Sequence, residues 1–348
     1  MLLGGLLFRI IPAEKQPDVK VPQGILYSAV CGTIVFSFYP LVSIARSFSD
    51  GSGSEFWRLL WQIVLTFDAG DAWRITVVCA LGLLVLLQIE KRHPGNSIRY
   101  AALALAVVSI FALGWSSHVS SYAGMPGFLA HTVHFLAVSL WVGVVLTAGR
   151  YAVDHTRWIK FLNWFTPLAV SCVAAVICSG LVIMSYLVPE YVHSWILPYG
   201  QALLLKHLLL IPLLAYGFIN GFLMRARIRR QPDFNPKMWL RAEGLIALGV
   251  FSITAFMSHQ APPHLVRESL DSVSPSSWFL FFQPNGFQPN RALGFDVNSQ
   301  SLLLACIAIL LFMVLLLTFV KSIRVWVSLC ISVLFVVVAY AALMIAIH

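Results

Sequence analysis

The sequence of 348 residues is 59% hydrophobic and only 11% charged, whereas soluble domains carry about 25% charged residues. Such a chain cannot cover its apolar surface in water, which excludes a soluble enzyme. The formal net charge of +9 does not indicate a nucleic-acid binder, because no basic cluster comes with the polar, aromatic surface that such binding needs. The composition instead indicates a protein that uses the lipid bilayer as its solvent.

Nine apolar segments are each long enough, at about 1.5 Å per residue, to cross or nearly cross a hydrocarbon layer of about 30 Å. Because backbone amides must be paired inside lipid, we expect each segment to be an α-helix. The predicted fold is therefore an all-α, polytopic transmembrane bundle. It forms a single integral membrane domain over residues 1–348, with an extracytoplasmic loop at residues 261–299. The nine predicted spans are Gly24–Ala45, Ala72–Ile89, Tyr100–Ser117, Phe128–Ala148, Phe161–Val188, Tyr199–Met224, Ala242–Ser258, Ser301–Val320 and Val325–Ile347.

Two further apolar segments are too short to span. Met1–Ile11 has about half the needed length and lacks the basic start and the cleavage site of a signal peptide. We interpret it as a short extra N-terminal helix, that is, a first helix that is truncated or whose start is misassigned. Glu55–Thr66 contains two tryptophans but is polar at its start, which predicts a helix that lies in the membrane interface.

The basic residues fall almost entirely in one alternating set of loops. Five lysines and arginines lie in the opposite loops, and Lys206 lies within a span. By the positive-inside rule, the basic set faces the cytoplasm. The seventeen lysines and arginines of that set lie in residues 9–20, 91–99, 150–160, 225–241 and 321–324.

The histidines show the opposite asymmetry. Only His93 and His155 of the ten fall in the cytoplasmic loops. His131 and His134 are three residues apart on one predicted helix, so their side chains share a face about 4.5 Å apart along the axis. A single histidine in a span more often hydrogen-bonds to another helix. Two imidazoles so placed predict a metal site, and imidazole suits copper and zinc.

Other candidate ligands lie at compatible depths. His207 is expected at the depth of His134, roughly 10 Å below the outer boundary. His118 and His259 end their spans near the surface, and Met257 offers a thioether, which suits Cu(I) and favours copper. The predicted metal ligands therefore lie at two depths: His118, His259 and Met257 near the surface, and His131, His134 and His207 toward mid-membrane.

Paired membrane histidines also suit a second chemistry. Two imidazoles on facing helices can ligate one haem iron, and His134 and His207 are the best pair by depth. The alternative prediction is a b-type haem protein that passes electrons. No nucleotide-binding loop is visible in the sequence, so coupling to ATP is not expected, and neither is an enzymatic activity.

Four segments of the chain carry a family resemblance. They are HTVHFLAVSLWVGVV (His131–Val145), FTPLAVSCVAAVICSGLV (Phe165–Val182), PYGQALLLKHLLLIPLLAYGFIN (Pro198–Asn220) and RAEGLIALGVFSITAFMSHQAPP (Arg241–Pro263). In their order and spacing they resemble the CopD family of bacterial inner-membrane copper-resistance and copper-uptake proteins, with a CopD-like core at residues 100–263. The resemblance implies copper transport across the bacterial cytoplasmic membrane, with an extracytoplasmic CopC-like copper binder as a partner. The outward bias of the histidines favours uptake.

Overall fold

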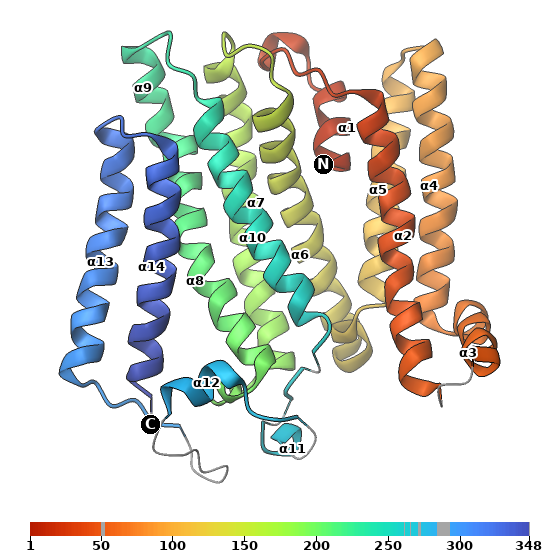
Figure 1. The fold of residues 1–348 in the computed structure, drawn as a ribbon. Helices are drawn as coiled ribbons and strands as arrows, with labels where there is room; N and C mark the ends of the chain where they lie inside the picture. Colours follow the sequence, from red (N-terminus) through yellow and green to blue (C-terminus); the bar gives the residue numbers. More distant parts are fainter. Residues whose placement is uncertain (50–52, 261, 265, 271–272, 284–292, 348) are drawn as a thin grey trace. The chain divides into compact units, whose positions relative to one another are not determined.

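The computed structural model describes the chain except for residues 50–52, 261, 265, 271–272, 284–292 and 348. In this part of the chain, nine helices are long and apolar enough to cross a membrane. The predicted all-α polytopic bundle with nine spans is thereby confirmed (Figure 1). The spans are α2 (Gln23–Phe48), α4 (Asp68–Arg92), α5 (Asn96–Trp115), α6 (His118–Tyr151), α7 (Trp158–Leu187), α8 to α9 (Pro198–Arg230), α10 (Lys237–Met257), α13 (Ser299–Val320) and α14 (Val325–Ile345).

The chain divides into two compact units, unit 1 (Met1–Tyr186) and unit 2 (Leu187–His348). The prediction of one integral membrane domain over the whole chain stays a prediction.

The short N-terminal segment of unit 1 is a helix, α1 (Leu2–Ile10), as predicted. It packs against α6 through glycines: a Cβ atom on Gly4 would collide with the carbonyl oxygen of Gly143. Helices in membranes pack closely where small residues let their backbones touch. The two glycines therefore fix where α1 meets α6.

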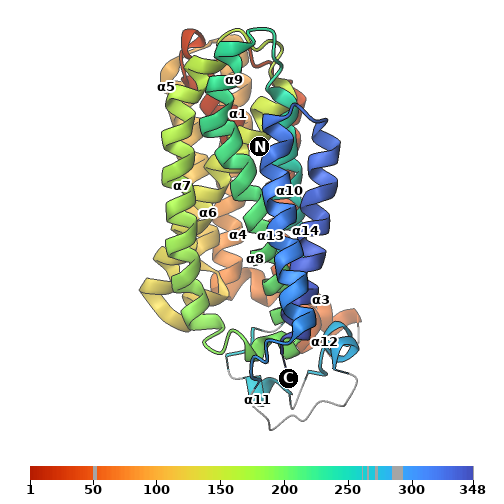
Figure 2. The same ribbon diagram turned by 90° about the vertical axis from the view of Figure 1, so that its left-hand side faces the viewer.

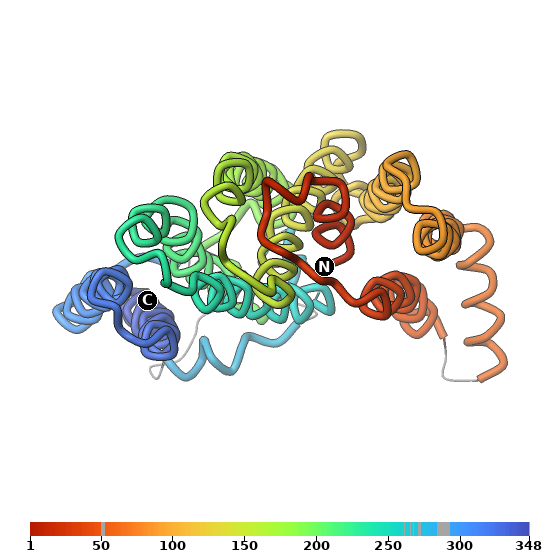
Figure 3. The backbone as a smooth tube through the Cα atoms, turned by 90° about the horizontal axis from the view of Figure 1, so that it is seen from above, coloured from red at the N-terminus to blue at the C-terminus, as the bar shows by residue number. Residues whose placement is uncertain are grey.

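The predicted interfacial segment of unit 1 forms α3 (Gly53–Thr66). Its Leu60 and Ile63 are buried against α2, while Trp57 and Trp61 are exposed. Viewed down the spans, α3 is seen lengthwise whereas α2 and α4 are seen end-on (Figure 3). This amphipathic helix thus lies across the spans of its unit, which is the arrangement expected of an interfacial helix.

Three basic segments of unit 1 meet at one end, which we call the basic end of unit 1 (residues 9–20, 91–99 and 150–160). The backbone N–H of Val153 donates to Asp18 O (2.7 Å), and that of Lys20 donates to Tyr151 O (3.1 Å). The carboxylate of Asp154 is partly desolvated, which alone would raise its pKa. Hydrogen bonds from Asp18 and Thr156 and the nearby charge of Arg157 outweigh that effect, so the pKa of Asp154 lies below its usual value.

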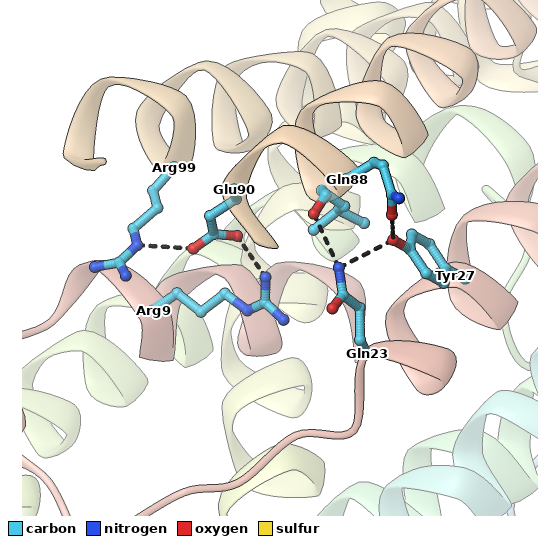
Figure 4. A network of polar contacts seen from close by, with 7 residues as sticks. Arg9, Gln23, Tyr27, Gln88, Glu90 and Arg99 are labelled. Carbon is cyan, nitrogen blue, oxygen red and sulfur yellow. Dashed lines mark hydrogen bonds and ion pairs between the residues drawn. The ribbon is translucent and has the colours of Figure 1, made fainter. Parts of the chain in front are cut away.

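A buried carboxylate ties α1, α4 and α5 together at this end. Glu90 is only 8% exposed and accepts hydrogen bonds from Arg9 and, at 2.8 Å, from Arg99 (Figure 4). Beside it, Tyr27 donates to Gln88 Oε1 at 2.7 Å and accepts from Gln23 at 2.9 Å. These contacts bring basic loops that are far apart in the sequence to one end, as an alternating set of spans requires.

Unit 2 is built on two antiparallel helix pairs. In the first pair, α10 contacts α8 (Pro198–Phe218), which continues through a π-helix, η3 (Ile219–Leu223), into α9 (Met224–Arg230). In the second pair, α13 and α14 run side by side in both views (Figures 1 and 2). Residues 225–241 and 321–324 form the basic end of unit 2. There Arg227 hydrogen-bonds to Ser322 and lies 5.2 Å from the ring centroid of Phe234.

The predicted extracytoplasmic loop at 261–299 contains two short helices, α11 (Val266–Leu270) and α12 (Ser277–Phe282), and several of its residues lie outside the described part. α12 is held at both ends. The Ser276 N–H donates to Ile196 O just before α8 (2.7 Å), and Gln283 Nε2 donates to Ile347 O just after α14 (2.8 Å). In Figure 3, α12 is seen lengthwise, so it lies across the spans of unit 2.

Candidate metal site

The candidate ligands of unit 1 lie on α6, which contains a bend. The sequence places His118 at the end of the preceding span, but α5 ends at Trp115 and His118 is the first residue of α6. Gly124 has φ +61°, a left-handed conformation that glycine adopts without steric cost, and Pro126 follows it. His118 is exposed and is separated by this bend from the continuous helix that carries His131 and His134.

His131 and His134 are both half-buried on the continuous part of α6. The Nδ1 atom of His134 lies 3.1 Å from Oγ of Ser179 on α7. Next to Ser179, a Cβ atom on Gly180 would lie 3.4 Å from Cε1 of the same ring, so Gly180 lies directly beside the imidazole. The ring of His131 lies 6.5 Å from that of Phe135 on its own helix.

The contact with Ser179 favours one tautomer of His134. A serine hydroxyl has one hydrogen, and its nearest acceptor is Ala175 O on the same helix. When Ser179 donates to Ala175 O, its Oγ can accept from Nδ1 of His134. With its hydrogen on Nδ1, the ring carries its lone pair on Nε2, which is the arrangement of a metal-ligating histidine whose other nitrogen is held by a hydrogen bond.

In unit 2, His207 lies on α8 and is also held by a hydroxyl. Its Nδ1 is 2.7 Å from the hydroxyl of Tyr191, and the two rings are 5.4 Å apart. Burial raises the pKa of Tyr191 to about 12, so the phenol is neutral at physiological pH. The nitrogen of His207 that this hydroxyl does not engage is again Nε2.

The remaining predicted ligands lie at the end of α10. Met257 is the last residue of this helix and is buried, whereas His259 is exposed in the turn that follows. The turn is closed by hydrogen bonds from His259 N to Phe256 O and from Gln260 N to Met257 O. His259 therefore lies at a helix end, as the sequence predicts, while the Met257 side chain is buried.

The structure thus presents the six predicted ligands as two groups, one in each unit. His118, His131 and His134 belong to unit 1, and His207, Met257 and His259 belong to unit 2. Among the described residues, no three His, Cys, Asp or Glu side chains are gathered as a ready metal cluster. The assignment of all six as ligands of one copper path stays a prediction.

The fold defines a multi-pass, helical membrane protein whose spans carry imidazoles held by hydroxyl groups. Residues 159–257 match the family model described as "Copper resistance protein D", and residues 1–128 match "Copper resistance protein D-like, N-terminal domain". The chain belongs to the CopD family of copper-resistance membrane proteins, which confirms the resemblance found in the sequence. It is a multi-pass protein of the bacterial inner membrane.

Two curated relatives agree with this family. The chain is 29% identical over 284 residues to "Copper transport protein CutJ" of Bacillus subtilis (strain 168), covering 77% of this chain and 52% of the relative. It is 22% identical over 185 residues to "Inner membrane protein YebZ" of Escherichia coli (strain K12), covering 50% of this chain and 61% of the relative. The matches thus span about half to three fifths of these relatives. No solved structure matches the chain.

Proposed function

We propose that this protein moves copper ions across the bacterial inner membrane, in the direction of uptake. The observation that carries the proposal is the pair His131 and His134 on α6, together with the hydrogen bond that orients Nε2 of His134 as a donor atom. Membership of a copper-resistance family and the likeness to a protein named for copper transport support the choice of metal. Imidazole and thioether donors suit copper better than they suit hard cations.

The path has two levels. His118, His259 and Met257 take copper at the outer face, where His118 and His259 are exposed at helix ends. His131, His134 and His207 hold it deeper, within the spans. The partner that we propose as copper donor is an extracytoplasmic CopC-like protein. Uptake is favoured because the ligands lie in the outer halves of their helices, away from the basic ends that the positive-inside rule places in the cytoplasm.

Copper titration of the purified protein tests the site. His131→Ala and His134→Ala should each weaken copper binding at least tenfold, since losing one of three or four ligands costs about 1.4 kcal/mol or more. The measurement is competition with a copper chelator, with folding checked by thermal unfolding. His155→Ala, in the loop at the basic end of unit 1, is the matched control and should bind copper like the parent.

Two outcomes would contradict the proposal. If both α6 variants bind copper as tightly as the parent, the two imidazoles are packing residues. If the purified parent shows an intense Soret band that is lost in His134→Ala or His207→Ala, the histidines ligate haem and the protein passes electrons.

A further inference from the structure

Unit 2 contains a buried carboxylate that the copper path does not use. Glu243 on α10 is 2% exposed and Asn220 in η3 is 4% exposed. Asn220 Nδ2 donates to Glu243 Oε2 at 2.8 Å and to the carbonyl of Trp239 at 3.2 Å. Along α8 and η3, Asn220 is about 20 Å from His207 toward the basic end of unit 2. An ionisable group at such a place is expensive to bury, and in membrane proteins it commonly serves transport or proton transfer.

The backbone around Asn220 is also unusual. Residues Ile219–Leu223 form a π-helix between two α-helices, and single π turns inside α-helices occur frequently at functional sites. Oδ1 of Asn220 is buried without a hydrogen-bond partner in the described part of the chain. The O–H of a protonated Glu243 would supply a donor for this oxygen.

A proton fits this pair better than copper does. The atoms that this pair could offer to a metal ion are oxygens, which Cu(I) disfavours relative to sulfur and nitrogen. When Glu243 is ionised, the amide of Asn220 donates to it. When Glu243 is protonated, a half-turn of the amide lets its O–H donate to Oδ1. The pair can thus bind and release a proton, COO⁻ plus H⁺ giving COOH, and keep a hydrogen bond in both states.

We propose that Glu243 and Asn220 form a proton-binding site in the inner half of unit 2, loaded and unloaded as copper moves. The site itself does not depend on copper, whereas its coupling to copper movement rests on the proposed function. Glu243 lies about 9 Å from the start of α10, close to the aqueous phase at the basic end. The charged side chains and the tyrosine nearest to the pair along the surrounding elements are Tyr216 on α8, Arg225, Arg227, Arg229 and Arg230 on α9, Lys237 and Arg241 on α10, and Arg324 just before α14, while Lys206 and His207 lie farther along α8.

Infrared difference spectroscopy of the whole protein across a pH change tests the proton site. The parent should show the carbonyl band of a protonated carboxyl group that titrates. Glu243→Gln should abolish this band while folding as the parent does, because the glutamine oxygen still accepts from Asn220. Asn220→Leu should shift the band by removing its amide partner. Glu90→Gln is the control for a buried carboxylate outside this site: Glu90 lies in unit 1 and accepts hydrogen bonds from Arg9 and Arg99, so the Glu243 band should remain. A band that persists in Glu243→Gln would overturn the proposal.

Copper flux into proteoliposomes tests the coupling. In the parent, an imposed pH gradient should change the initial rate of copper flux. In Glu243→Gln, which should bind copper as the parent does, the initial rates with and without the gradient should be equal. A gradient response in Glu243→Gln equal to that of the parent would overturn the coupling. If the parent carries no copper, the proposed function fails, while the infrared band still decides the proton site.

Discussion

Ser179 and Tyr191 each hold one imidazole of the candidate metal site. Each offers an oxygen to the Nδ1 side of a histidine, His134 and His207 respectively. The histidines themselves could be predicted from their spacing and depth. Their hydroxyl partners could not, because Ser179 lies 45 residues from His134 in the sequence, and a serine inside an apolar helix usually bonds only to its own backbone. A serine followed by a small residue, Gly180, is the one local signal.

Ser179→Ala removes the acceptor for Nδ1–H of His134, so the ring loses its fixed tautomer and orientation. Copper binding should weaken about ten- to a hundredfold, the usual effect of losing a hydrogen-bond partner behind a metal ligand. Chelator competition measures the affinity.

Two matched variants separate this role from packing. Ser179→Thr keeps the hydroxyl and should retain most of the affinity. Ser185→Ala, where an exposed hydroxyl on the same helix donates only to Val182 O (2.8 Å), should leave copper binding unchanged. Equal affinities in Ser179→Ala and the parent would mean that Ser179 does not orient His134.

At the scale of elements, hydropathy and length predict all nine spans, because lipid forces the backbone to pair within each helix. Two helices differ from the prediction in their interior. α6 bends at Gly124, and α8 passes through a π-helix at Ile219–Leu223 before ending as α9. Neither feature changes the apolar pattern, which explains why hydropathy alone cannot locate them. A glycine shortly before Pro126 is the signal for the bend, and the π-helix has no comparable signal.

The placement of α1 leads to a prediction for Glu90. Glu90→Gln leaves Arg9 and Arg99 without their shared anion. Losing one partner of a buried ion pair costs about 3–5 kcal/mol, and less here because both arginine side chains are partly exposed. Thermal unfolding should therefore begin several degrees lower. Lys20→Ala, which breaks the exposed pair with Asp18 at 3.2 Å, should change little. A parent-like unfolding curve for Glu90→Gln would show that glycine packing alone holds α1.

At the scale of the whole molecule, the topology follows from the basic residues. The structure gathers residues 9–20, 91–99 and 150–160 at one end of unit 1, and residues 225–241 and 321–324 at one end of unit 2. This grouping is what alternating spans produce. The orientation of the basic ends toward the cytoplasm is a prediction from the positive-inside rule.

Cysteine labelling tests that orientation. In a variant without native cysteines, Ser274→Cys should react with a membrane-impermeant reagent added outside intact spheroplasts, and Gln231→Cys should react only after lysis. Both positions are exposed in the structure, so access is decided by the side of the membrane. The reverse pattern would place the histidines near the cytoplasm and remove the argument for uptake.

The hydrogen bonds at both ends of α12 affect how deeply unit 2 sits in a bilayer. Its hydrogen bonds to Ile196 and Ile347 hold it level with the start of α8 and the end of α14. Trp278 and Phe281 are 69% and 77% exposed, and aromatic rings at this level favour the zone of lipid headgroups. Because α12 cannot tilt independently of the two helix ends, its rings set the height of unit 2 relative to the lipid surface. In a thicker or thinner bilayer, the difference between the length of the spans and the thickness of the hydrocarbon layer then falls at the opposite, basic end. There the long arginine side chains can extend to the aqueous phase.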